Sequence, residues 1–181
     1  RWSMDLGYGY GYPLFNFYAP FSYLIGASFV ALGFNYLVAT KMVFIFYFLI
    51  SAFGIFLLLR NLVGLLPTLV GAIVFSFVPY RALDVYVRGS LGEFAAYSIF
   101  PLVLWANIQL MKFSKSTIRS AFFGLLCAFL IISHSISALI YLSFLAIFNL
   151  LKLLAIEKRY KAKFLLNVLR SCLIAVSISS F

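Results

Sequence analysis

The sequence predicts an all-α, polytopic bundle of transmembrane helices, and three observations lead to this fold class. Hydrophobic residues make up 65% of the 181 residues, whereas charged residues make up only 10%. A soluble globular domain typically has about 45–50% apolar and about 25% charged residues. Apolar runs close to the roughly 20 residues that a helical span needs recur along the chain. Short basic gaps separate several of these runs, so lipid is the solvent that the composition fits.

The net charge of +10 fits a membrane protein better than a protein that binds nucleic acid. The lysines and arginines gather in short gaps between apolar runs, where membrane proteins keep cytoplasmic positive charge. Cys127 and Cys172 each lie inside an apolar run, where a free cysteine behaves as a small hydrophobe. We therefore expect membrane lipid as the surroundings, no nucleic-acid partner and no disulfide framework.

The elements follow from the order of the apolar runs. Residues 1–20 are rich in Gly, Tyr and Pro, which break helices and favour the interface. Residues 21–40 form either a transmembrane helix or a juxtamembrane helix on the outer face. Residues 42–181 should form one membrane domain. Its spans are expected at about 42–59, 62–80, 93–111, 120–133, 135–151 and 164–181. The start at Arg1 and the apolar run still open at Phe181 predict a fragment truncated at both ends.

The basic gaps orient these spans. Lys112–Arg119 and Lys152–Lys163 should both be cytoplasmic, because Lys and Arg concentrate on that side. One straight helix from Ser120 to Leu151 would be roughly 48 Å long and would place the two gaps on opposite sides. A hairpin turning at Ser133-His134-Ser135 is therefore predicted. Counting back from it, Arg81–Gly92 becomes an exterior loop.

This expected loop contains the candidate site. Arg81, Asp84, Arg88 and Glu93 lie close together between two apolar runs. If the segment is helical, Arg81, Asp84 and Arg88 are spaced by three and four residues and share a face. These three residues, which we call the Arg–Asp–Arg ladder, have two possible roles. They either form ion pairs that only fix the loop or form an anion site. The anion site is favoured by the planar arginine fork, which matches phosphate oxygens.

Two further features flank the candidate site. Ser90 and Glu93 fit a capping box at the start of the following helix. His134 is the only histidine, and its turn is predicted to face the same side. It is either a hydrogen-bonded tip residue or a general base or phosphate contact beside the arginines. One histidine and scattered carboxylates are too few ligands for a metal site. We expect no cofactor in this fragment, and nothing in it supports a divalent metal in the whole protein.

A family resemblance rests on three blocks of residues in a fixed order. They are Arg1–Pro20 (RWSMDLGYGYGYPLFNFYAP), then Pro79-Tyr80-Arg81 with Asp84, Arg88-Gly89 and Glu93, then Ser133-His134. Together they resemble the bacterial membrane-protein family called 6-pyruvoyl-tetrahydropterin synthase-related, over nearly the whole chain. That family in turn resembles the GT-C class of polytopic glycosyltransferases, which take a sugar from a polyprenyl-phosphate donor.

The resemblance implies roles for the first two segments. Residues 1–20 would end the first exterior loop, and residues 21–40 would be the juxtamembrane helix on the outer face. The acidic catalytic motif of such enzymes would precede Arg1, so no catalytic residue is assigned within this chain. Pterin chemistry is not expected, because the sequence has no histidine cluster for zinc.

The function that follows is that of a membrane glycosyltransferase-like protein in the bacterial inner membrane. It would use a polyprenyl-phosphate-linked sugar donor at the exterior face, in modifying envelope glycans or lipids. Two alternatives stay open: a transporter of lipids or envelope precursors, and a non-catalytic membrane scaffold. Buried charges and broken helices would favour the transporter. An acidic residue in the upstream exterior loop would favour the enzyme over the scaffold.

Overall fold

The structure is a computed structural model that describes residues 2–112 and 117–180. It is 81% helical, and the described residues contain an isolated β-bridge between Ser3 and Tyr12 but no strand. Five helical segments in this described part are long and apolar enough to cross a membrane. The prediction of an all-α, polytopic membrane fold is therefore confirmed. Arg1, Phe181 and residues 113–116 of the expected basic gap lie outside the described residues.

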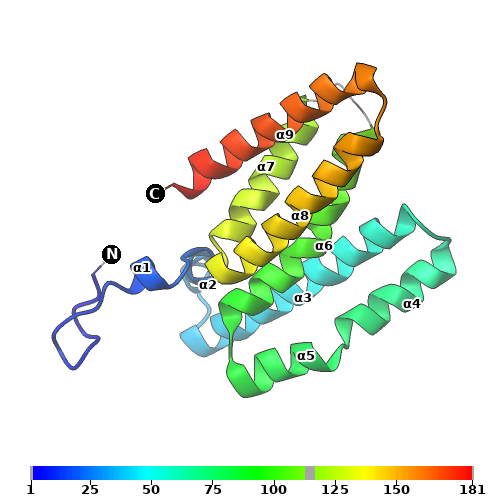
Figure 1. The fold of residues 1–181 in the computed structure, drawn as a ribbon. Helices are drawn as coiled ribbons and strands as arrows, with labels where there is room; N and C mark the ends of the chain where they lie inside the picture. The colour runs from blue at the N-terminus through cyan, green and yellow to red at the C-terminus, as the bar shows by residue number, and fades with distance from the viewer. Residues whose placement is uncertain (1, 113–116, 181) are drawn as a thin grey trace.

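The helices follow one another with short connections. In chain order they are α1 (Leu14–Phe17), α2 (Phe21–Ala31), α3 (Tyr36–Arg60), α4 (Leu65–Ser76), α5 (Pro79–Ala82), the π-helix η1 (Leu83–Arg88), α6 (Leu91–Lys112), α7 (Thr117–Ile131), α8 (Ser135–Ala155) and α9 (Lys158–Ser179). From α3 onward, successive segments run up and down the bundle (Figure 1). This arrangement gives the bundle two chemically different ends.

One end of the bundle, which we call the basic end, carries the turns from α3 to α4 and from α8 to α9 (Figure 1). Basic residues in and beside these two turns are Arg60, Lys152, Lys158, Arg159, Lys161 and Lys163. The opposite end, which we call the Arg88 end, carries the junctions from α2 to α3, from η1 to α6 and from α7 to α8. Of the two segments predicted to be cytoplasmic, Lys152–Lys163 thus lies at the end far from Arg88.

Residues 21–40 do not form one continuous helix, because a turn after Ala31 separates α2 from α3. Helix α2 has 11 residues, a length of about 17 Å, which is too short for a hydrocarbon core of about 30 Å. The backbone reverses at Gly33, whose φ of 96° suits glycine. Asn35 then caps α3, because its side chain accepts a hydrogen bond of 2.9 Å from the Val38 backbone N–H.

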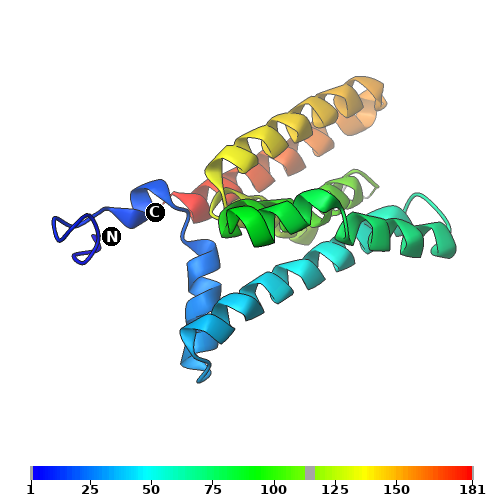
Figure 2. The same ribbon diagram turned by 90° about the horizontal axis from the view of Figure 1, so that it is seen from below.

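Helix α2 runs across the end of the bundle rather than along it (Figure 2). It is held there by a 3.0 Å hydrogen bond between the buried hydroxyls of Ser22 and Tyr47. A second hydrogen bond holds it as well, because the Phe21 backbone N–H donates to the Ile132 carbonyl at 3.1 Å. Its length and direction favour the juxtamembrane alternative over a span.

The segment that follows α4 is helical where the charge pattern of the sequence predicts a loop. Helix α4 ends at Ser76, and Val78 is extended with a ψ of 134°. Proline disfavours the α-helical region for the residue before it and is well placed in the first turn of a new helix, which explains the restart at Pro79. The expected exterior loop Arg81–Gly92 is therefore helical as far as Arg88, and α4 through η1 form one candidate span.

Helices α7 and α8 meet at the hairpin that the sequence predicts around His134. Helix α7 has 15 residues and α8 has 21, which correspond to about 22 Å and about 32 Å. The turn packs tightly on α6, since a Cβ on Gly92 would stand 2.9 Å from the Ser133 carbonyl oxygen. This contact brings His134 beside the start of α6.

Small residues allow the helices to approach closely. A Cβ on Gly54 of α3 would stand 3.0 Å from the Leu102 backbone nitrogen in α6. A Cβ on Gly124 of α7 would stand 2.6 Å from the Ser171 carbonyl oxygen in α9. The Ser171 hydroxyl also donates to the Ser120 carbonyl at 2.8 Å. Small residues and interhelical hydrogen bonds are the usual basis of helix packing in lipid.

Candidate functional site

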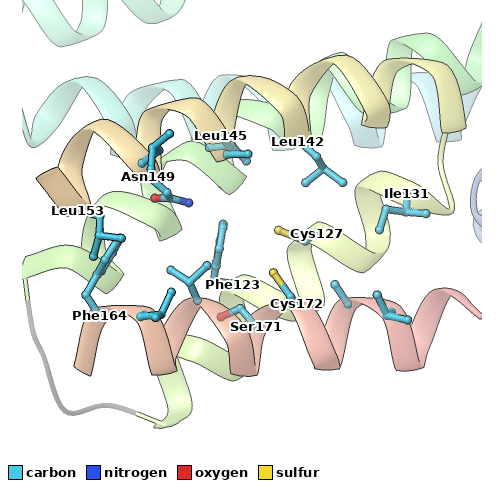
Figure 3. Close-up of a pocket in the computed structure, with 16 residues that line it drawn as sticks. Phe123, Cys127, Ile131, Leu142, Leu145, Asn149, Leu153, Phe164, Ser171 and Cys172 are labelled. Atoms are coloured by element: carbon cyan, nitrogen blue, oxygen red, sulfur yellow. The ribbon is translucent and has the colours of Figure 1, made fainter. Parts of the chain in front are cut away.

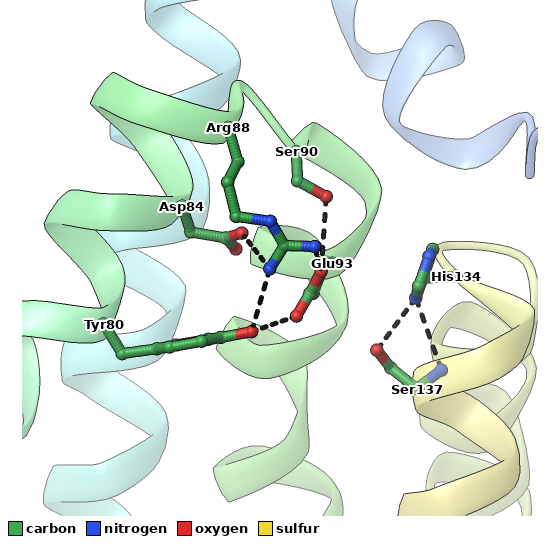
Figure 4. A network of polar contacts seen from close by, with 7 residues as sticks. All are labelled: Tyr80, Asp84, Arg88, Ser90, Glu93, His134 and Ser137. Carbon is green, nitrogen blue, oxygen red and sulfur yellow. Dashed lines mark hydrogen bonds and ion pairs between the residues drawn. The ribbon is translucent and has the colours of Figure 1, made fainter.

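The most prominent polar contacts at the Arg88 end form a cluster that we call the Arg88 cluster: Tyr80, Asp84, Arg88, Ser90 and Glu93 (Figure 4). Arg88 Nη2 lies 2.7 Å from Glu93 Oε2, and Arg88 Nη1 lies 3.4 Å from Asp84 Oδ1. The same Nη1 donates to the Tyr80 hydroxyl at 3.2 Å, and that hydroxyl donates to Glu93 Oε1. Two carboxylates and one phenol therefore hold one guanidinium fork.

Local backbone structure brings these side chains together. The π-helix η1 ends at Arg88 and is followed by its cap Gly89, whose φ is 59°. The backbone N–H groups of Gly89 and Ser90 both donate to the Asp84 carbonyl, which closes the turn. Helix α6 begins directly afterwards, so Glu93 stands in its first turn opposite Arg88. Single turns of π-helix occur frequently at functional sites, where they change the direction of side chains.

Arg81 does not join the Arg88 cluster. Only 4% of its surface is exposed, and its guanidinium donates to the hydroxyls of Ser51 in α3 and Ser98 in α6. Its Cζ lies 4.6 Å from the ring centre of Phe94 and 5.2 Å from that of Phe48. The prediction that Arg81, Asp84 and Arg88 share one face is therefore wrong for Arg81. Its side chain points into the bundle, whereas that of Arg88 points out.

Asp84 is the most deeply buried acid of the cluster. It is 1% exposed, and neither carboxylate oxygen has a hydrogen-bond partner among the described residues. Its electrostatic partners are Arg88, which is about half-exposed, and Arg81 on the inner side. A carboxylate removed from water is costly unless it is paired. Asp84 therefore links the exposed arginine to the buried one, although it touches only Arg88 within ion-pair distance.

His134 is placed beside the cluster and caps α8. Its Nδ1 accepts the Ser137 backbone N–H at 3.3 Å and lies 2.8 Å from the Ser137 hydroxyl (Figure 4). Its ring also faces the start of α6, since a Cβ on Gly92 would stand 3.4 Å from His134 Cδ2. The hydrogen-bonded tip role is thus present in the structure, with Nδ1 occupied by the cap.

The contacts of Ser90 differ from a reciprocal capping box. In such a box the Glu side chain accepts the backbone N–H of the capping residue. Here that N–H donates to the Asp84 carbonyl, while the Ser90 hydroxyl lies 3.5 Å from Glu93 Oε2. The Glu93 carboxylate is held by Arg88 and Tyr80 instead, because the positive fork outcompetes a neutral backbone donor.

Tyr80 is a cluster member that the sequence does not single out as a candidate site residue. It precedes Asp84 by four residues and Arg88 by eight, a spacing that places all three on one helical face. A continuous helix through residue 88 would have revealed it, but the expected span ends at Tyr80 and Arg81–Gly92 is expected as a loop. The missed signal is the helix restart at the proline.

The fold and the charge pattern define the chain as a multi-pass α-helical membrane protein. A scan against protein families adds the particular family. The model described as 6-pyruvoyl-tetrahydropterin synthase related domain, membrane protein, matches residues 15–181, so the chain belongs to this family. Comparison with curated proteins and with solved structures gave no match. Over residues 2–112 and 117–180, no three His, Cys, Asp or Glu side chains gather as a metal site would require.

Proposed function

We propose that the chain is part of a membrane glycosyltransferase of the GT-C kind, acting at the exterior face of the bacterial inner membrane. Its donor would be a sugar linked to polyprenyl phosphate, and its product a modified glycan or lipid of the cell envelope. The observation that carries the proposal is the Arg88 cluster, which presents a half-exposed guanidinium at the end of the bundle opposite the basic turns.

Arg88 is suited to hold the leaving phosphate. Its planar fork matches two phosphate oxygens, and its side chain is 45% exposed. Glu93 and Tyr80 occupy the fork in the structure, so a donor phosphate would take over the contact that Glu93 makes. When the sugar–phosphate bond breaks, the phosphate oxygen keeps the electron pair, and Arg88 stabilises the added negative charge.

Arg81 has a different role from the phosphate contact that the sequence suggests. Because it is 4% exposed, it would not contact the donor phosphate. Its positive charge acts on Asp84, and Asp84 positions Arg88. The acceptor hydroxyl needs a base, which the resemblance assigns to the acidic motif before residue 1. No described residue is given that role.

Substitutions at Arg88 test the proposal. Arg88→Ala in the whole protein should lower transfer from a polyprenyl-phosphate sugar on the order of 100-fold, as loss of one preorganised donor does. Arg88→Lys should retain part of the activity, because a point charge replaces the fork. Arg170→Ala, which removes an exposed arginine from α9, serves as the matched control. Wild-type activity in Arg88→Ala would remove the proposed role.

A second function, transport of lipids or envelope precursors, is favoured by one specific observation. The span from α4 to η1 is broken at Val78-Pro79, and the buried Arg81 lies just beyond the break. Broken helices with buried charge mark the substrate sites of many transporters. A cavity of about 290 Å³ lies beside Arg81, lined mainly by apolar residues that include Phe48 and Phe77.

Arg81→Met separates the two functions. It preserves the length of the apolar stem and removes the charge inside the bundle. Loss of substrate flux in proteoliposomes, with transfer activity reduced less than in Arg88→Ala, would favour the transporter. Unchanged flux would leave the transferase as the better account.

A further inference from the structure

An apolar groove lies between α7, α8 and α9 (Figure 3). None of its lining residues belongs to the Arg88 cluster. Its volume is about 400 Å³, within the range of about 300–1,000 Å³ that ligand pockets usually have. Its walls are formed by Phe123 of α7, Leu142 and Leu145 of α8, and Phe164 and Val168 of α9. The groove is therefore shaped by three helices but lined almost entirely by hydrocarbon.

The groove is partly open. Two of its lining residues, Leu150 of α8 and Leu165 of α9, are 56% and 46% exposed, and Cys172 is exposed as well. In a bilayer this exposed apolar surface faces acyl chains.

Positive charge stands at one end of the groove. Lys161 precedes Phe164, Leu165 and Val168 by three, four and seven residues, so it continues the groove-lining stripe of α9 toward the basic end. On α8, Lys152 follows the groove residue Asn149 by three. Glu157, the acid in this turn, forms an ion pair with Arg159, with its Oε2 2.7 Å from Arg159 Nε. Lys152 Nζ lies 5.8 Å from the ring centre of Phe148 on the same helix. Both lysines thus lie near the basic end of the apolar groove.

One polar side chain interrupts the apolar wall. Asn149 points into the groove (Figure 3), and its Oδ1 has no hydrogen-bond partner in the described part of the chain. From Asn149 to the end of α8 at Ala155 is about 9 Å along the helix axis. A buried carbonyl oxygen of this kind requires a hydrogen-bond donor. An amphiphile whose head lies at the lysines would bring its ester or hydroxyl groups to this depth.

We propose that this groove binds an anionic phospholipid of the surrounding membrane. One acyl chain lies between α8 and α9, the glycerol region contacts Asn149, and the phosphate contacts Lys152 and Lys161. Charge complementarity selects this occupant, because basic pockets between transmembrane helices on the cytoplasmic side suit anionic head groups. The site is separate from the Arg88 cluster and stands whether or not the chain is a transferase.

Native mass spectrometry of the purified whole protein tests this inference. Phosphatidylglycerol and phosphatidylcholine with identical acyl chains are the probes. The wild-type protein should retain phosphatidylglycerol several-fold better. Lys161→Glu should reduce this preference about fivefold or more, since a lysine at an anionic surface contributes about 1 kcal/mol. Lys41→Glu makes the same charge change on an exposed α3 residue toward the Arg88 end, and it should leave the preference unchanged.

Two further results bear on the occupant. Ala146→Trp, which fills the groove, should lower retention of both lipids. In membranes, a lipid-soluble maleimide should label Cys172 of the wild-type protein. Equal retention of the two lipids, or a preference that survives Lys161→Glu, would overturn the proposal. An unlabelled Cys172 without bound lipid would also overturn it, because another protein segment would then cover the groove.

Discussion

Replacing Gly124 by alanine tests the close contact between α7 and α9. The new Cβ would stand 2.6 Å from the Ser171 carbonyl oxygen and 3.0 Å from Ile174 Cβ, so one helix must move. The movement would also stretch the 2.8 Å hydrogen bond from the Ser171 hydroxyl to the Ser120 carbonyl. The substitution therefore perturbs packing and an interhelical hydrogen bond together.

The expected loss of stability follows from three contributions. Overpacking costs about 1–3 kcal/mol, and a lost interhelical hydrogen bond in a membrane protein costs about 0.6 kcal/mol. Alanine in place of a helical glycine gains about 1 kcal/mol of helix propensity. The net loss of unfolding free energy for Gly124→Ala is then about 0.6–2.6 kcal/mol. For a chain of this size 1 kcal/mol lowers Tm by roughly 2–4 °C.

The assay uses a cysteine in the same helix as the substitution. Cys127 is 6% exposed and lies one turn after Gly124, whereas Cys172 is exposed. In a Cys172→Ser background, a fluorogenic maleimide reports heating-induced exposure of Cys127 in detergent. Gly26→Ala is the matched control, because its Cβ would meet Val43 at an ordinary 3.6 Å. A Tm for Gly124→Ala equal to or above that of Gly26→Ala would refute the packing argument.

Two more predictions concern the ties around the Arg88 end. His134→Ala removes the cap on the Ser137 N–H and should cost about 1 kcal/mol of stability. His134→Asn should cost little, because asparagine can also cap the helix. Equal Tm values for the two variants would contradict the capping role. Tyr47→Phe removes the hydroxyl that is hydrogen-bonded to the Ser22 hydroxyl at 3.0 Å. Backbone hydrogen exchange in α2 should become faster, with little change in α9. Unchanged exchange in α2 would show that this hydrogen bond does not hold the helix.

The helical periodicity and loop charges could predict most of the architecture. The apolar runs reveal the spans, and the two basic gaps require a turn near His134 because a single straight helix would separate them. The break between α2 and α3 also has local signals, Gly33 for the reversal and Asn35 for the cap. Both residues are visible in the sequence as small or polar interruptions of an apolar run.

The direction of Arg81 could not be predicted in the same way. A regular helix would place Arg81, Asp84 and Arg88 on one face, but the chain changes to a π-helix at Leu83. The aromatic rings that surround the guanidinium come from α3 and α6, far away in sequence. Local spacing contains no information on such tertiary partners, so only the fold separates the buried arginine from the exposed one.

We propose that the Arg88 end and the basic end lie on opposite faces of the membrane, with Arg88 outside. Cysteine labelling of intact cells with a membrane-impermeant maleimide tests it directly, in a background with Cys127→Ala and Cys172→Ser. Arg88→Cys should react in intact cells, and Lys158→Cys should react only after the cells are opened. The reverse pattern would place the Arg88 cluster inside and contradict the account.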